Sequence, residues 1–146
     1  MIAGNGSLRD KINRELERKN LYSKVKLTDW IPQDKLPEQL NDLRFLILPS
    51  RMEGLPAIIQ QAMACGVVVL ATPVGGTPDL VKNEETGFIL DNDSPGCIAK
   101  TVIKALEHPE LIQISQNARR LIEREYNYEV SLRKCEKTLC STLSRN

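Results

Sequence analysis

The sequence contains few aromatic residues, a single histidine and no long apolar run. Aromatic side chains make up 4% of its 146 residues, and His108 is the only histidine. The longest purely apolar run, Val67–Ala71, is far shorter than the roughly 20 residues that a membrane span requires. No charged segment followed by an apolar one opens the chain, as it would in a secretory signal. We therefore expect a cytoplasmic protein.

The sequence also lacks an excess of either charge. Its 20 basic and 19 acidic side chains leave a net charge of +1, which gives no overall field to attract nucleic acid or an anionic membrane. No nucleic acid partner is therefore expected, and any bound anion must be held by local groups. Hydrophobic residues make up 41% and charged residues 27%, which is typical of a folded domain.

Metal-binding patterns are missing as well. The four cysteines do not have the paired spacing of a zinc site, and His108 stands before a proline in an expected helix break. We expect no bound metal, no other cofactor and reduced thiols.

The chain has the length of one domain, and we expect residues 1–146 to form a single one. Apolar patterning predicts strands that alternate with helices. The expected strands are Met1–Ala3, Lys24–Thr28, Arg44–Leu48, Val67–Ala71 and Gly87–Leu90. The expected helices run from Ser7, as N-cap, to Asn20, near Asp34–Leu43, from Leu55 to Gly66, for one turn after Pro78, from Ser94 to His108, and near Glu110–Tyr126 and Tyr128–Leu143.

This alternation indicates an α/β fold, with a Rossmann-like parallel sheet and helices on both of its faces. Ligands of such sheets bind outside the carboxyl ends of the strands. The informative loops are therefore Gly4–Ser7, Thr28–Pro32, Pro49–Leu55 and Thr72–Pro78. Glycines and helix starts dominate them, and these supply the free backbone N–H groups that hold phosphates.

Two of these loops carry candidate residues whose role the pattern leaves open. Gly4 and Gly6 form either a plain turn or a close approach to phosphate, and the third glycine of a dinucleotide fingerprint is missing, which disfavours an NAD site. Glu53, between a strand end and a helix start, either contacts a ligand or caps the helix.

The segment PSRMEGLPAIIQQAMACG (Pro49–Gly66), continued by VVVLATPVGGTPD, resembles the signature region of family 4 glycosyltransferases. Flanking segments agree with that family in order and spacing. These segments are Ile2–Leu16, the strand before Trp30-Ile31-Pro32, Thr86–Leu90 and Asn117–Arg120. The resemblance covers nearly the whole chain.

The resemblance implies the C-terminal half of a two-domain GT-B enzyme that binds a UDP- or GDP-sugar. Such an enzyme transfers the sugar to an acceptor with retention of configuration and without a metal, in the synthesis of polysaccharide or glycolipid. Its motif is a pair of acidic residues eight positions apart, and Glu53 takes the first position. The family then implies that Glu53 is a catalytic residue on the transferred sugar, and that the backbone of Gly54, Leu55 and Pro56 faces the donor.

The second acidic position holds Gln61, which departs from the family. An amide still hydrogen bonds to ribose hydroxyls, but it lacks the charge that makes a carboxylate acceptor roughly twice as strong. The other interpretation of Gln61 is a polar helix residue that points to solvent.

Two further pairs match the family near the donor. Gly75 and Gly76 match a loop beside it, and Trp30 and Ile31 match the region that lines the base. Each pair also has a plainer interpretation, as a turn for the glycines and as packing for the tryptophan.

Family members have one more strand and helix at the start of this domain, with an Arg and a Lys that bind the donor phosphates, and an N-terminal acceptor domain before them. We therefore expect a partial domain that lacks this first strand and helix and is inactive alone. Peripheral membrane association of the full enzyme is left open.

Two other functions stay open. One is a sugar-nucleotide epimerase of the same GT-B fold, which would need further acid and base residues in its cleft. The other is a non-catalytic interaction module, whose sheet edge or apolar face recruits a partner domain.

Overall fold

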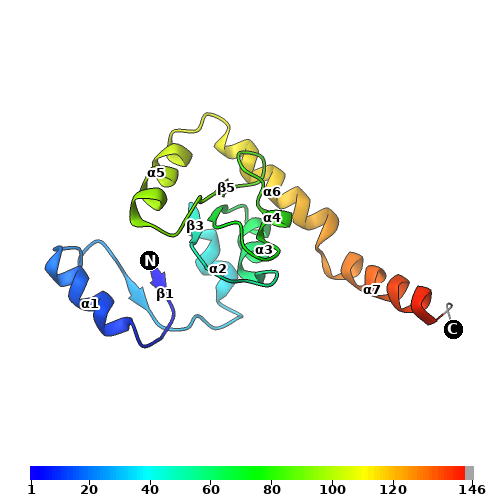
Figure 1. The fold of residues 1–146 in the computed structure, drawn as a ribbon, viewed down its shortest axis with the longest axis horizontal. Coiled ribbons are helices and arrows are strands. Elements are labelled where there is room, and N and C mark those ends of the chain that lie inside the picture. Colours follow the sequence, from blue (N-terminus) through cyan, green and yellow to red (C-terminus); the bar gives the residue numbers. More distant parts are fainter. Residues whose placement is uncertain (144–146) are drawn as a thin grey trace. The chain divides into compact units, whose positions relative to one another are not determined.

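The structure, a computed structural model, describes residues 1–143 (Figure 1). The chain forms two compact units, which divide after Glu38. The strands are β1 (Ile2–Ala3), β2 (Leu27–Thr28), β3 (Phe45–Leu48), β4 (Val68–Ala71) and β5 (Phe88–Ile89). The helices are α1 (Arg9–Arg18), α2 (Leu36–Asn41), α3 (Ala57–Ala64), α4 (Thr77–Leu80), α5 (Pro95–Leu106), α6 (Leu111–Glu125) and α7 (Tyr128–Leu143).

Unit 1 contains β1 and β2, which pair in parallel with Ile2 opposite Leu27. The prediction that Ser7 caps the first helix is wrong. Helix α1 begins at Arg9, Leu8 holds the N-cap position without a side-chain bond, and the Arg9 amide donates to the Gly6 carbonyl over 3.0 Å. A backbone hydrogen bond in a turn therefore precedes the helix, in place of the expected side-chain cap from Ser7.

The second strand is shorter than the predicted Lys24–Thr28. The amides of Lys24 and Val25 donate back to the Leu21 carbonyl, over 2.9 and 3.0 Å. These residues therefore belong to the turn that follows α1, because their amides are used there and not in a ladder. Alternating side chains alone do not reveal this use of the backbone.

Unit 2 contains a parallel sheet in the order β3-β4-β5. Leu48 lies opposite Ala71, and Leu70 lies opposite Phe88. All of β4 is buried, which agrees with its continuous apolar run, since a central parallel strand is covered on both faces. The predicted α/β fold with parallel pairing is confirmed, and the strands form two separate sheets, one in each unit.

The core of unit 2 lies around β4. Val68 and Leu70 of β4 form a buried cluster with Phe88, with Ala105 of α5 and with Ile114 of α6. Helix α3 packs on β4 and on α6, and it buries Ile59, Ala62 and Met63. Because side chains of a strand alternate between faces, Val69 and Ala71 point away from the cluster that holds Val68 and Leu70.

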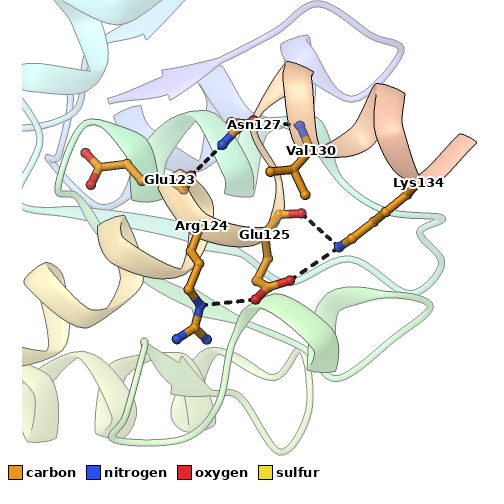
Figure 2. A network of polar contacts seen from close by, with 6 residues as sticks. All are labelled: Glu123, Arg124, Glu125, Asn127, Val130 and Lys134. Atoms are coloured by element: carbon orange, nitrogen blue, oxygen red, sulfur yellow. Dashed lines mark hydrogen bonds and ion pairs between the residues drawn. The ribbon is translucent and has the colours of Figure 1, made fainter. Parts of the chain in front are cut away.

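A polar network fixes the joint between α6 and α7 (Figure 2). The Asn127 side chain donates to the Glu123 carbonyl over 2.6 Å and accepts from the Val130 amide over 2.9 Å. The second bond is the usual N-cap bond of a helix start. Lys134 of α7 reaches back to the carbonyl and the carboxylate of Glu125 at the end of α6.

Figure 1 shows α7 continuing outward beyond α6, away from β3 and β5. Residues 131–141 of this helix are all exposed. Among the described residues, no helix combines the length and the apolar character that crossing a membrane demands.

Candidate functional site

The loops after β3, β4 and β5 leave the same edge of the unit 2 sheet, because the strands are parallel. They cover residues 49–56, 72–76 and 90–94. The first of these loops carries Glu53, which is half-buried, and it ends at the start of α3. Apart from Gln61, which lies within α3, the predicted unit 2 residues therefore lie in these loops.

Glu53 does not cap α3. The N-cap position belongs to Pro56, and the helix start has no side-chain cap hydrogen bond. The capping interpretation of Glu53 is therefore wrong. The amides of Ala57 and Ile58 have no helical acceptor at this end, and the positive end of the helix dipole is present there too. Both features favour an anionic or oxygen-rich ligand.

The loop that carries Glu53 is tied to the loop after β4 by two hydrogen bonds. The Thr72 hydroxyl donates to the Ser50 carbonyl. The Gly76 amide donates to the Gly54 carbonyl over 2.6 Å. The two loops therefore meet on both sides of Glu53, and one of these contacts joins backbone to backbone.

Gly75 and Gly76 permit this close approach. Gly75 has a φ of +55°, and a methyl group built on it would overlap the Glu53 carbonyl oxygen and lie 2.7 Å from that of Gly54. A methyl group on Gly76 would lie 2.9 Å from Leu55 Cδ1. Turn geometry alone therefore does not account for this glycine pair.

An ion pair joins the same loop to the loop after β5. Arg51 Nε lies 2.6 Å from Asp93 Oδ2, and this hydrogen bond and charge hold the pKa of the Asp93 carboxyl below its usual range. The Arg51 side chain is 88% exposed. Solvent screens such a pair, so its contribution to stability is small.

Gln61 lies one turn into α3 and is half-buried. Its backbone carbonyl accepts from the Cys65 amide over 3.1 Å, as in a regular helix. Around the start of the same helix, Gly54 and Leu55 are exposed and Pro56 is buried. The exposed pair stands at the surface of the loop, while the proline anchors the loop to the core.

Unit 1 has a comparable edge of its own, where the loops after β1 and β2 carry Gly4, Gly6, Trp30 and Ile31. The Gly4 amide donates to the Thr28 carbonyl over 3.1 Å. Arg9 Nη1 bridges the two loops, since it lies 3.2 Å from the Gly4 carbonyl and 3.0 Å from Asp29 Oδ1. The side chain of one residue therefore joins both loops.

Trp30 is 81% exposed, so the packing interpretation of this tryptophan is wrong. Its indole is open to a stacking partner. Ile31 beside it is half-buried.

Among the described residues, no group of three or more His, Cys, Asp or Glu side chains is arranged to hold a metal ion. Cys65, Cys97 and Cys135 are free thiols.

Sequence reasoning missed the residues that hold these loops. Arg9 and Asp93 lie outside the loops that the sequence predicted for these edges. Arg51 and Thr72 lie inside those loops, but no role was predicted for them. Thr72 had a detectable signal, because it follows β4 directly and Ser50 follows β3 closely, so a parallel register brings them together. Arg51 and Asp93 are 42 positions apart, and no local pattern joins them.

The profile of the family described as "Glycosyl transferases group 1" matches residues 1–127. The chain belongs to this family. The match ends at Asn127, the residue that joins α6 to α7. It therefore includes both sheets and the loops at both edges.

Curated relatives of this group 1 glycosyltransferase chain are considerably longer than it is. The amylovoran biosynthesis glycosyltransferase AmsK of Erwinia amylovora is 24% identical over 145 residues, which cover 94% of this chain and 36% of AmsK. The chain spans about a third of the length of the relatives that it matches.

Solved structures share its fold. HepE of Anabaena, solved in complex with UDP and glucose, aligns with a TM-score of 0.85 at 20% identity, over 96% of this chain and 39% of HepE. The C-terminal domain of LpcC, a group 1 protein of Francisella tularensis, aligns with a TM-score of 0.74 at 21% identity, over 83% of this chain and 63% of that one. The chain thus has the fold of a group 1 C-terminal domain.

Proposed function

We propose that this chain is the donor-binding part of a retaining family 4 glycosyltransferase and binds a UDP- or GDP-sugar. One observation carries the proposal: the loop with Glu53 and the uncapped start of α3 lie at the carboxyl edge of the sheet, beside Gly75 and Gly76. Free amides and a positive helix end suit a diphosphate. The likeness to HepE, which was solved with UDP-glucose, supports the same ligand class.

In this proposal, each of the unit 2 residues has a role. Glu53 accepts hydrogen bonds from the hydroxyls of the transferred sugar and is the catalytic residue of this part. The exposed backbone of Gly54 and Leu55 faces the sugar and the phosphates, and Pro56 fixes the start of α3. Gln61 meets the ribose hydroxyls.

For unit 1, taken by itself, the proposal also includes contacts with the nucleotide. Trp30 and Ile31 line the base, for which the exposed indole offers a stacking face. Gly4 and Gly6 allow the backbone to approach the donor closely.

Titration of the chain with UDP, GDP, UDP-glucose and GDP-mannose, followed by calorimetry and by amide chemical shifts, tests the binding proposal. We expect binding to one nucleotide series, with shift changes around residues 53–57. Glu53→Gln should weaken binding of the sugar nucleotide more than binding of the free diphosphate. Absence of both heat and shift changes with all four ligands would contradict the proposal.

Gln61→Glu tests the ribose contact. A carboxylate gives charge-assisted bonds to the diol, which are about twice as strong as neutral ones, so we expect tighter binding of the nucleotide. Gln60→Glu, one position earlier on α3, is the matched control for added charge. Equal or weaker affinity after Gln61→Glu, measured by calorimetry, would remove Gln61 from the ribose site.

Transfer itself requires an acceptor site, so the test of activity uses the complete protein that contains this chain. We expect sugar transfer from the donor to an acceptor with the anomeric configuration retained. Isomerisation of the sugar nucleotide without an acceptor would favour an epimerase. A chain that binds no nucleotide and associates with another domain would favour an interaction module.

A further inference from the structure

At the unit 2 edge, the loop after β3 and the loop after β4 differ in how much space surrounds their glycines. Gly54, in the loop with Glu53, has open space where a methyl group would be. Gly75 and Gly76 have none, because the backbone and side chain of residues 53–55 occupy that space. Glycine is therefore required in the loop after β4, because the loop that carries Glu53 packs directly against that loop.

The amide of Gly76 is already used. It donates to the Gly54 carbonyl over 2.6 Å, so a donor phosphate would have to compete with a short backbone hydrogen bond for this N–H group. A direct phosphate contact from this amide is therefore a poor explanation for the glycine at position 76.

We propose that Gly75 and Gly76 are positioning residues, which set the place of Glu53 by letting the two backbones touch. This proposal rests on the proposed donor-binding function. The pair acts on the donor through the Glu53 loop and not through its own contact with phosphate.

The rigidity of β4 makes such a support effective. The loop with the glycines follows directly after β4, the central strand, of which every residue is buried. The Glu53 loop follows β3, whose residues are only partly buried. A displacement of the contact is therefore taken up by the Glu53 loop, because the loop on the buried strand has less freedom to move.

Gly75→Ala is the direct test, and Gly66→Ala is its matched control. Both glycines have a positive φ, +55° and +75°, so both substitutions impose similar backbone strain. A methyl group on Gly66, however, meets only the Ser115 hydroxyl oxygen at 3.4 Å. The difference between the two variants therefore isolates the contact with the Glu53 loop.

The first measurement is made without ligand. We expect Gly75→Ala to shift the amide resonances of residues 53–55, while Gly66→Ala leaves them in place. The second measurement is the affinity for UDP-glucose and for UDP by calorimetry. We expect Gly75→Ala to weaken UDP-glucose binding about tenfold or more, since losing a hydrogen bond to a charged group such as Glu53 has about that effect, and to weaken UDP binding less.

Equal effects of the two variants on the resonances and on the affinities would overturn the proposal. If Gly75→Ala does not fold, Gly76→Ala decides. Its methyl group would lie 2.9 Å from the flexible end of Leu55 and 3.0 Å from the Gly54 carbonyl oxygen, contacts less close than those of Gly75, and should cause a smaller change in the same direction. If the unmodified chain binds neither ligand, the proposed function fails, and the ligand-free resonances alone then decide whether the glycines position Glu53.

Discussion

The two units hold their carboxyl edges in different ways. In unit 2 the loops stand on a buried strand and touch through a backbone hydrogen bond between Gly76 and Gly54. The structure describes all of unit 1 (residues 1–38), and Leu16 is the one buried residue there. The Arg9 side chain bridges the loops of this unit. The backbone contact at the unit 2 edge is thus carried by a buried strand, whereas at the unit 1 edge a side chain reinforces the backbone bond from Gly4 to Thr28.

Truncation of core residues should show the largest difference between the units. We expect Phe88→Ala in unit 2 to cost about 3–5 kcal/mol of unfolding free energy, as for other buried aromatic residues, and Leu16→Ala in unit 1 to cost about 2 kcal/mol. Phe88 is fully buried and packs edge-on against His108. Urea unfolding followed by circular dichroism measures both values, and equal costs would remove the contrast in core strength.

Two buried threonines of unit 2 allow a hydroxyl with hydrogen bonds to be compared with a hydroxyl that has none among the described residues. The Thr86 hydroxyl donates to the Leu80 carbonyl and accepts from the Lys82 amide, so Thr86→Val should cost about 1–3 kcal/mol. The Thr77 hydroxyl has no hydrogen-bond partner in the described part of the chain. Thr77→Val should therefore be neutral or stabilising within about 1 kcal/mol. A Thr77→Val variant as unstable as Thr86→Val would show that a partner is bound there in solution.

Removal of the bridging cation tests how each edge is held. Arg9→Met removes the bonds from this side chain to the Gly4 carbonyl and to Asp29, and we expect faster hydrogen exchange at the Gly4 amide. Arg51→Met removes the ion pair with Asp93 but leaves the bond between Gly76 and Gly54. Exchange at Gly76 should therefore stay slow, and similar acceleration in both variants would refute the difference between the edges.

Acid should produce the smallest effect. The hydrogen bond and charge of Lys104 hold the pKa of the Glu84 carboxyl below its usual value, which is about 4.3 in an unfolded chain. This pair stabilises unit 2 above that value, and the contribution is lost as pH falls through the lower folded pKa. Lys104→Met should therefore make the loss of stability in acid shallower.

Arg18→Met in unit 1 is the matched control for the acid experiment, because Arg18 lowers the pKa of Glu15 within the same helix. The variants are compared by urea unfolding between about pH 3 and pH 7, a window that spans the unfolded carboxyl value. Identical pH dependence in Lys104→Met and the unmodified chain would show that the Glu84 pair contributes nothing measurable.

Much of the fold was predictable because it depends on local patterns. The continuous apolar run at Val67–Ala71 predicted the buried strand β4, and the helical pattern from Ser94 onward predicted α5, of which Ser94 is the N-cap. The prediction was wrong where backbone groups formed hydrogen bonds with one another in turns, as near Ser7 and at Lys24. There, turn hydrogen bonds replaced the expected side-chain cap and the expected strand ladder.

The sequence by itself determined the α/β class, the order of the elements and the loops that carry Glu53, Gly75 and Gly76, because apolar periodicity and glycines act over a few neighbouring residues. Only the tertiary structure decided that Gly75 and Gly76 lie against Glu53 and Gly54, that Arg51 pairs with Asp93, and that Trp30 is exposed. These facts depend on parallel strands that bring distant loops to one edge, and on burial, which no single segment determines.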